Sequence, residues 1–399
     1  MRHTIISVIR KDRTFIISAL ALFVLMLVME NVNGRFWLYD FKVMYAAADA
    51  LINGKQVYGI PFGLDTGYYK YSPVTLIFFI PFALLPYPIA SVLDFLMIAM
   101  SIIALILLLV RLTNKRIFRA ETYSQGVLFA ILACVIVHLV RELHLGNTNI
   151  FLMLFLTLGL YFTLKEKPWL AGILLAIAIL TKPYFILVLL PLVLHRKFKV
   201  VLGTLVTMGG LAGIFILATG ITKGKELFTD WVRAMGAHSG YLASNHTISS
   251  LLHQYTGITL PLSFSFYMLG GALILLFVTF WWTTKGKTPS PSDLLVHYFA
   301  GVALVPNILI TDTEHFLFSI PLITLLVLYL FHKRNTRLTV LFAVIFLLYG
   351  GNITDLWGKS LSMTLDNWGL LGVGNLGVIV GAMVVGLKVG SRQLAGECH

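Results

Sequence analysis

Asp40 is the residue whose type and setting point most directly to chemistry. It lies in the first long polar interruption of an otherwise apolar sequence, at residues 37–73, and begins an amphipathic run that stops at Asn53-Gly54, a pair that commonly ends helices. A carboxylate at the start of a helix either caps that helix, for about 1 kcal/mol, or serves as a base. The local sequence leaves both interpretations open.

Four further polar groups stand at the ends of apolar runs. They are Arg141-Glu142 with His144, Asn147 and Asn149; Thr181-Lys182-Pro183; Asn245-His246-Thr247; and Asp312-Thr313-Glu314-His315. Ionisable residues at membrane depth are costly, so they are candidates for function unless a structural role explains them.

Lys182, Asn147 and Asn149 each have such a structural alternative. Lys182 can extend from a helix end toward water, with its methylene stem on apolar surface. The two asparagines can cap the helix expected to begin near Ile150. The sequence alone gives these roles about the same weight as ligand binding.

The remaining candidates divide in the same way. The Glu314-His315 step lacks the His-x-x-x-His spacing of zinc-binding helices, which favours a phosphate or sugar contact over a metal. Tyr69 and Tyr71 fit an aromatic belt at a membrane interface, and they also fit a surface on which sugar rings stack.

Composition places the chain in a membrane. Of its 399 residues, 58% are hydrophobic and 12% charged, which is more apolar surface than a water-soluble core can bury. The net charge of +13 comes from basic residues clustered in short segments between apolar runs, so we interpret it as orienting charge and not as a nucleic-acid surface. Cys134 lies in an apolar run and Cys398 in the tail, so no disulfide is expected.

The apolar runs predict an all-α polytopic membrane protein. Residues 14–29 resemble a retained signal anchor. Residues 74–86 are too short to cross, because a spanning helix needs roughly 17 to 25 residues, and we expect a re-entrant or interfacial helix there. About twelve crossings then remain, at 14–29, 89–110, 124–140, 149–164, 168–181, 184–194, 200–219, 261–283, 294–310, 316–331, 338–350 and 368–387.

This arrangement places both termini in the cytoplasm. The basic cluster at 111–119 then falls inside, as the positive-inside rule requires. We expect one integral membrane domain over 1–399, and its parts are a tail at 1–13, a first outer loop at 31–87, a second large outer loop at 220–260 and a tail at 388–399. All four polar groups and Asp40 then gather on the face opposite the cytoplasm.

Several polar blocks resemble glycosyltransferase family 87. They are DFKVMYAAA (40–48) and YSPV (71–74), LGNTN (145–149), AG (171–172) followed by KP (182–183), NHTISSLL (245–252) and TEHF (313–316). The chain departs from the family pattern where Asn147 and His246 stand in place of glutamines. The resemblance covers roughly residues 37–330.

The resemblance implies an inverting enzyme of the GT-C fold. Such an enzyme moves a sugar, mannose or another hexose, from a polyprenyl phosphate to a hydroxyl of a glycolipid or glycan on the outer face of a cell membrane. Asp40 is then the expected base, with Lys182, His315 and Arg141 as candidates for the donor phosphate. The expected sugar or acceptor contacts are Glu314, Asn147, Asn149, Tyr69, Tyr71, Asn245 and His246. No metal and no cofactor are expected.

A twelve-helix transporter or lipid-linked-sugar flippase is the alternative, because the crossing count and cytoplasmic termini fit that class as well. Secondary transporters are built from repeats with binding groups near the bilayer midplane. Here the polar groups gather at one face and no strong repeat is evident, which favours the transferase.

Overall fold

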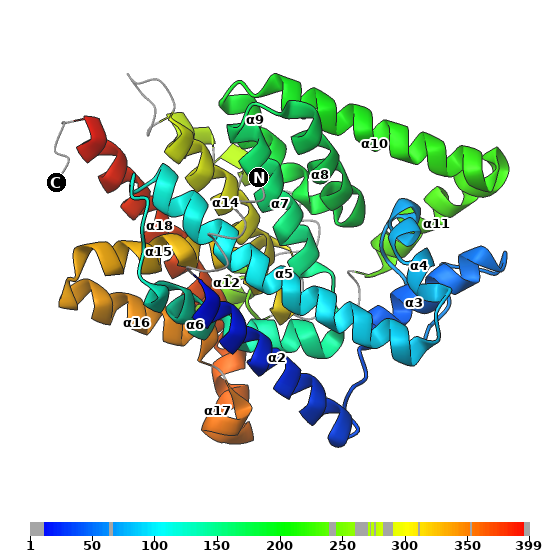
Figure 1. The fold of residues 1–399 in the computed structure, drawn as a ribbon, viewed down its shortest axis with the longest axis horizontal. Helices are drawn as coiled ribbons and strands as arrows, with labels where there is room; N and C mark the ends of the chain where they lie inside the picture. Colours follow the sequence, from blue (N-terminus) through cyan, green and yellow to red (C-terminus); the bar gives the residue numbers. More distant parts are fainter. Residues whose placement is uncertain are drawn as a thin grey trace.

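The computed structural model consists of helices joined by loops in its described part, residues 12–63, 67–238, 245–259, 270–271, 273–274, 277–281, 290–309, 312–351 and 353–394. Within these residues the only strand-like pairing is a single bridge between Pro61 and Tyr68. The elements are α2 (Arg13–Val32), α3 (Tyr39–Ile52), η1 (Pro73–Phe78), α4 (Ile80–Ala83), α5 (Tyr87–Arg116), α6 (Gln125–Leu145), α7 (Asn149–Leu164), α8 (Pro168–Thr181), η2 (Pro183–Val188), α9 (Leu189–Leu194), α10 (Phe198–Thr219), α11 (Ile221–His238), α12 (Ile248–Thr256), α14 (Pro291–Ile308), η3 (Thr313–Ser319), α15 (Ile320–Lys333), α16 (Thr336–Gly350), α17 (Thr354–Asn367) and α18 (Leu370–Leu394) (Figure 1).

The chain is a multi-pass membrane protein. Among the described residues, five helices are long and apolar enough to cross a bilayer, and a sixth crossing forms if the bent pair α17–α18 counts as one. Shorter apolar helices at Asn149–Leu164, Pro168–Thr181, Pro183–Leu194 and Thr336–Gly350 coincide with further predicted crossings. The predicted crossing at 261–283 lies largely outside the described residues, as do most of the 1–13 tail and Cys398. The total of twelve stays a prediction.

The centre of the molecule is α14. Every one of its residues except Pro291 and Asp293 is buried, because α18, η3, η2 and α9 pack around it. A helix that is apolar on all sides belongs in the interior of a bundle. This arrangement holds the start of η3, where Glu314 and His315 lie, against the middle of the fold.

Small residues bring the helices of the α7–α8–α10 layer into close contact. A Cβ atom on Gly172 of α8 would lie 2.6 Å from the backbone of Gly203 in α10. On Gly159 of α7 it would lie 2.7 Å from the Leu175 side chain. Such contacts between small residues are a common way for membrane helices to associate. They fix the end of α8, and therefore the position of Lys182.

Residues 74–86 do not form a helix that spans a bilayer. They fold as the short 3₁₀ helix η1 and the four-residue helix α4, which precede α5. Pro73, Pro81 and Pro86 interrupt this stretch, and proline lacks the N–H that a continuous helix needs. Neither piece is long enough to cross, as the sequence predicts, and their depth in the membrane stays a prediction.

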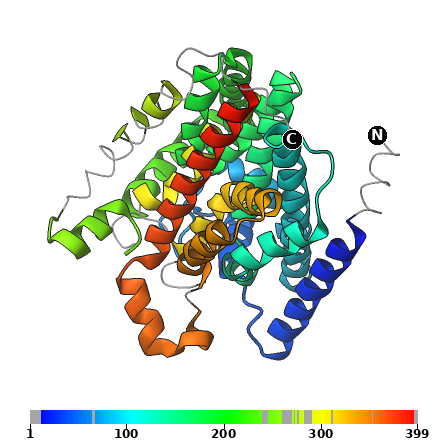
Figure 2. The ribbon, with the colours of Figure 1, turned by 90° about the vertical axis from the view of Figure 1, so that its left-hand side faces the viewer.

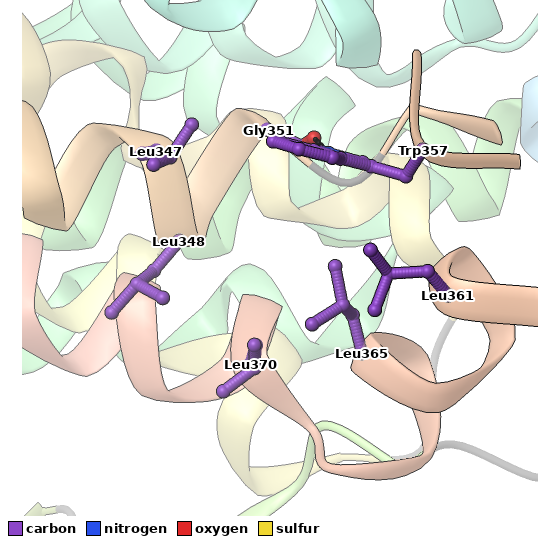
Figure 3. A pocket seen from close by; sticks show the side chains of 7 residues that line it. All are labelled: Leu347, Leu348, Gly351, Trp357, Leu361, Leu365 and Leu370. Carbon is purple, nitrogen blue, oxygen red and sulfur yellow. Dashed lines mark hydrogen bonds between the residues drawn. The ribbon is translucent and has the colours of Figure 1, made fainter. Parts of the chain in front are cut away.

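One end of the molecule carries α17, which projects from the helix bundle together with the C-terminal end of α2, while α18 leads back toward the opposite end (Figures 1 and 2). An apolar pocket of about 230 Å³ lies at the base of α17, lined by Leu347, Leu348, Gly351, Trp357, Leu361, Leu365 and Leu370 (Figure 3). No ionisable side chain lines it, so the chemistry must be sought elsewhere.

Candidate active site

The turn between α6 and α7 is the centre of the polar site. Its geometry begins with Gly146, which ends α6 in a left-handed conformation (φ 66°). The carbonyl of Glu142 accepts hydrogen bonds from the N–H groups of Gly146 and Asn147, at 3.0 and 3.2 Å. A Cβ atom on Gly146 would lie only 2.8 Å from the Cβ of Phe41. Because the glycine is small, α3 packs directly on the turn and brings Asp40 to Asn147.

Asp40 lies in the first turn of α3 and accepts a hydrogen bond at Oδ2 from Asn147 Nδ2, at 2.6 Å. It does not cap its helix, contrary to one of the interpretations of the sequence. The N-cap position belongs to Leu38, which has φ 41°, and no side chain bonds the first N–H groups there. Burial raises the pKa of Asp40, while the positive charges of Lys70 and Lys182 lower it in part.

Lys182 stands at the break between α8 and η2, where Pro183 ends the α-helical hydrogen bonding. Its side chain does not extend to water as the structural alternative supposes, because the residue is only 4% exposed. Its Nζ instead donates to Asn149 Oδ1 at 2.5 Å and to His315 Nε2 at 2.8 Å, and it lies 5.6 Å from the centre of the Tyr71 ring.

The pKa of Lys182 is lowered to about 8, mainly by burial and also by the nearby charge of Lys70, while the charges of Glu142, Glu314 and Asp40 oppose the shift. An ammonium with such a pKa changes its charge near neutral pH. Any function that needs the cation is therefore sensitive to pH in the alkaline range.

His315 is held in one tautomer by its partners. Its Nδ1 lies 3.1 Å from the carbonyl oxygen of Asp312, which can only accept, so the ring proton is assigned to Nδ1. Nε2 then accepts from Lys182. Both ring nitrogens are engaged in this arrangement, and the imidazole orients the ammonium of Lys182.

Arg141 and Glu314 form an ion pair at the edge of this cluster, with 3.5 Å between Nε and Oε2. The Arg141 side chain is 55% exposed, while the Glu314 side chain is 3% exposed. Arg141 therefore faces the accessible side of the cluster, and Glu314 joins it to the buried side.

Asp312, Glu314 and His315 each offer a ligand atom, and these atoms lie within 4.8 Å of one another. By the types of their ligand atoms, these three side chains could hold a metal ion. However, Lys182 donates to His315 Nε2, so a cation bound there would have to displace the ammonium. The arrangement around Lys182 suits an anion better than a metal ion.

Three breaks in helical structure converge on the site. The 3₁₀ helices η1, η2 and η3 follow Ser72, Lys182 and Asp312, and each of these N-cap residues has an extended backbone. The hydroxyls of Thr75 and Thr181, 3.3 Å apart, join η1 to the end of α8. The predicted groups at Lys182 and at Asp312–His315 thus meet because each stands where a helix is interrupted.

Two predicted asparagines have roles other than capping α7. The N-cap residue of α7 is Thr148, and its side chain makes no capping bond. Asn147 Oδ1 accepts a hydrogen bond from the N–H of Thr148 at 2.7 Å, while its Nδ2 donates to Asp40. Asn149 faces Lys182 instead.

Asn245 and His246 lie apart from this cluster, whereas Tyr69 borders it through its ring contact with Tyr71, with 5.8 Å between centroids. Tyr69 is fully buried, and its hydroxyl donates to the carbonyl of Ser72 at 2.9 Å. His246 Nε2 lies 3.0 Å from Asp366 Oδ1 in α17, and Asn245 Nδ2 lies 3.4 Å from Asp366 Oδ2.

The His246 ring contacts the Phe316 ring, with 5.7 Å between ring centroids, so this second polar group adjoins η3 next to His315. Phe316 therefore separates the second group from the Lys182 cluster. Tyr71, in contrast, lies beside Lys182.

Sequence reasoning named Glu142 in the same polar group as Arg141 but gave a role only to Arg141. Glu142 is fully buried in α6, and its carboxylate accepts hydrogen bonds from Asn149 Nδ2 and the N–H of Ile150, each at 2.9 Å. The signal was present, because an acid within an apolar run is costly. Asp366 was also missed, and its partner His246 is 120 positions away in sequence.

The fold and the site together define the class of this protein. It is a polytopic helical protein with a buried polar cluster where helices are interrupted. Residues 69–311 match the sequence model of glycosyltransferase family 87. The chain belongs to this family.

The chain is similar to an alpha-(1->3)-arabinofuranosyltransferase of Corynebacterium glutamicum, with 25% identity over 239 residues. The aligned part is 59% of this chain and 54% of that relative, so the chain matches only about half of the relative's length. No solved structure matches the chain. The segment that matches the family includes Glu142, Asn149 and Lys182, whereas Asp40 precedes it and His315 follows it.

Proposed function

We propose that the protein transfers a sugar, with inversion, from a polyprenyl phosphate to a hydroxyl of a glycolipid or glycan. The observation that carries the proposal is that one site holds both a carboxylate and a cation, each fixed by hydrogen bonds. Asp40 is held by Asn147, and Lys182 is held by Asn149 and His315, the two asparagines belonging to one turn. Family membership favours a transferase over the transporter alternative.

Asp40 is the proposed base. Its Oδ2 accepts from Asn147, which leaves Oδ1 to take the proton of the acceptor hydroxyl. As that proton moves to Asp40, the acceptor oxygen forms a bond to the anomeric carbon. The bond from this carbon to the phosphate oxygen breaks, and its electron pair leaves with the lipid phosphate. The pKa of Asp40, raised by burial, makes the carboxylate a stronger base than an exposed aspartate.

Lys182 and Arg141 are proposed to stabilise the leaving phosphate. Negative charge that grows on a leaving group is stabilised most by cations fixed in a site of low water content. Lys182 is buried and held by two partners, while Arg141 stands at the exposed edge. His315 orients Lys182, and Glu314, Asn149 and Tyr71 complete the wall of the site. The proposal needs no metal and no cofactor.

The transferred sugar has two candidates. The family resemblance implies mannose or another hexose. The similarity to an alpha-(1->3)-arabinofuranosyltransferase favours an arabinofuranosyl donor as the second candidate. Incubating the purified protein in vesicles with polyprenyl-phosphate mannose and, separately, with polyprenyl-phosphate arabinofuranose tests both. The proposal would be contradicted if polyprenyl phosphate is released from neither donor with any of the glycolipid and oligosaccharide acceptors.

We further propose a GT-C-type arrangement of about twelve crossings in a cell membrane, with both termini in the cytoplasm and the site on the outer face. The support is that α17 and the C-terminal end of α2 lie at one end of the molecule while α18 leads to the other (Figures 1 and 2). Residues 74–86, next to the site, would line the entry for the polyprenyl tail.

A further inference from the structure

Glu142 is a buried acid that the proposed reaction does not use directly. It lies in α6, three residues before the end of the helix, and is fully buried. Oε2 accepts from Asn149 Nδ2 and Oε1 accepts from the N–H of Ile150, each at 2.9 Å. Burial raises the pKa of Glu142 to about 8, while the hydrogen bonds from Asn149 and Ile150 and the charge of Lys182 favour the carboxylate, the form in which both oxygens accept.

The first consequence concerns the amide of Asn149. A side-chain amide has one donor end and one acceptor end. Glu142 takes the donor end, so the acceptor Oδ1 must face the other way, toward Lys182 Nζ. With the amide reversed, an NH₂ group would face the ammonium, and the two donors would repel each other. Glu142 therefore determines which end of Asn149 holds Lys182.

The second consequence concerns charge. The ionisable groups that act on Lys182 are the cation Lys70 and the acids Glu142, Glu314 and Asp40, and the neutral imidazole of His315 contacts it directly. Of the three acids, Glu142 has the largest effect on Lys182 and reaches it through a single bridging side chain. Its negative charge favours the ammonium over the neutral amine.

We propose that Glu142 is a positioning residue for the transfer reaction: through Asn149 it orients the Lys182 ammonium in the site, and its charge keeps that ammonium protonated. The link to a leaving phosphate rests on the proposed function. The simpler role is that of a cap for α7, since the bond from Ile150 N–H satisfies one of the free donors at that helix start. The two roles differ in what they do to the titration of Lys182.

A direct titration of Lys182 separates them without any donor. The protein carrying ¹³Cε-lysine is titrated in nanodiscs, and the Lys182 signal is assigned by its loss in Lys182→Arg. The midpoint is expected near pH 8 in the native protein. In Glu142→Gln it should fall by about one pH unit or more, because a nearby opposite charge is lost. Glu142→Asp keeps the charge and should show a smaller shift of the Lys182 midpoint. It is used in place of Glu142→Gln if the glutamine variant does not fold.

The control is Glu121→Gln, which neutralises an exposed acid paired with Lys115 and should leave the Lys182 midpoint unchanged. Binding of a polyprenyl phosphate without sugar gives the second readout. Glu142→Gln should bind it several-fold more weakly than the native protein at pH 8.5, and equally well or better at pH 6.5. A fall in thermal stability with an unchanged Lys182 midpoint would overturn the proposal and leave Glu142 as a cap. If the native protein binds no polyprenyl phosphate, the proposed function fails while the titration still decides the role of Glu142.

Discussion

In the proposed reaction, Lys182 and Asp40 share one site but need opposite protonation states. Asp40 must be deprotonated to accept a proton, and burial raises its pKa, so activity is lost on acidification at a higher pH than for an exposed aspartate. Lys182 must be protonated to hold phosphate, and its pKa is lowered to about 8, so activity is lost as pH rises through that value. The pH profile of kcat/KM should therefore be bell-shaped.

Lys182→Arg tests the alkaline side of that profile. Arginine keeps its charge throughout the accessible pH range, so the decline near pH 8 should disappear even if the overall rate falls. Lys165→Arg, at an exposed position between α7 and α8, serves as control and should keep the native profile. If the activity of Lys182→Arg still declines near pH 8, the decline belongs to the titration of another group.

Gly146 is a further residue at which the geometry of the site depends on the type of amino acid. In Gly146→Ala the new Cβ would meet Phe41 at 2.8 Å in a left-handed backbone, so α3 must move away from the turn. We expect a loss of roughly 1–3 kcal/mol in stability together with reduced transfer, because Asp40 moves with α3. Gly209→Ala in α10, where nothing lies within 4 Å, should leave both unchanged. Equal melting temperatures for Gly146→Ala and the native protein would contradict this.

At the scale of elements, interruptions of helices decide where the buried polar cluster lies. Lys182-Pro183 and Asp312 mark the starts of η2 and η3, and the Tyr71-Ser72-Pro73 segment leads into η1. These positions could be predicted because proline and polar residues between short apolar runs are local signals. The amphipathic α3 and its end at Asn53 were predicted for the same reason.

Other features depend on contacts that no local pattern contains. Asp40 has the position of a capping residue in sequence, yet Leu38 takes the N-cap and Asn147, 107 positions away, bonds the carboxylate. Tyr69 has the composition of an interface residue and is fully buried. The docking of α17 through Asp366 joins residues 120 positions apart, so only the fold reveals it.

For the whole molecule, the prediction concerns which side of the membrane each end faces. With Cys134 and Cys398 replaced by serine, a cysteine at Lys115 should resist a membrane-impermeant maleimide added to intact cells, since this exposed end of α5 is predicted to be cytoplasmic. A cysteine at the exposed Lys359 in α17 should react. The opposite pattern would show that residues 74–86 span the membrane or that the topology is inverted. Reaction of both would contradict the crossings proposed between Lys115 and Lys359.

The measurement that tests the central claim most directly is turnover by Asp40→Asn, compared with its affinity for the polyprenyl-phosphate sugar. Asparagine can still accept the hydrogen bond from Asn147 but cannot take a proton, so we expect kcat to fall by about 10²–10⁴-fold while the donor binds as in the native protein. Asp49→Asn, on the same helix, should transfer normally. Near-native turnover by Asp40→Asn would contradict the assignment of Asp40 as the base.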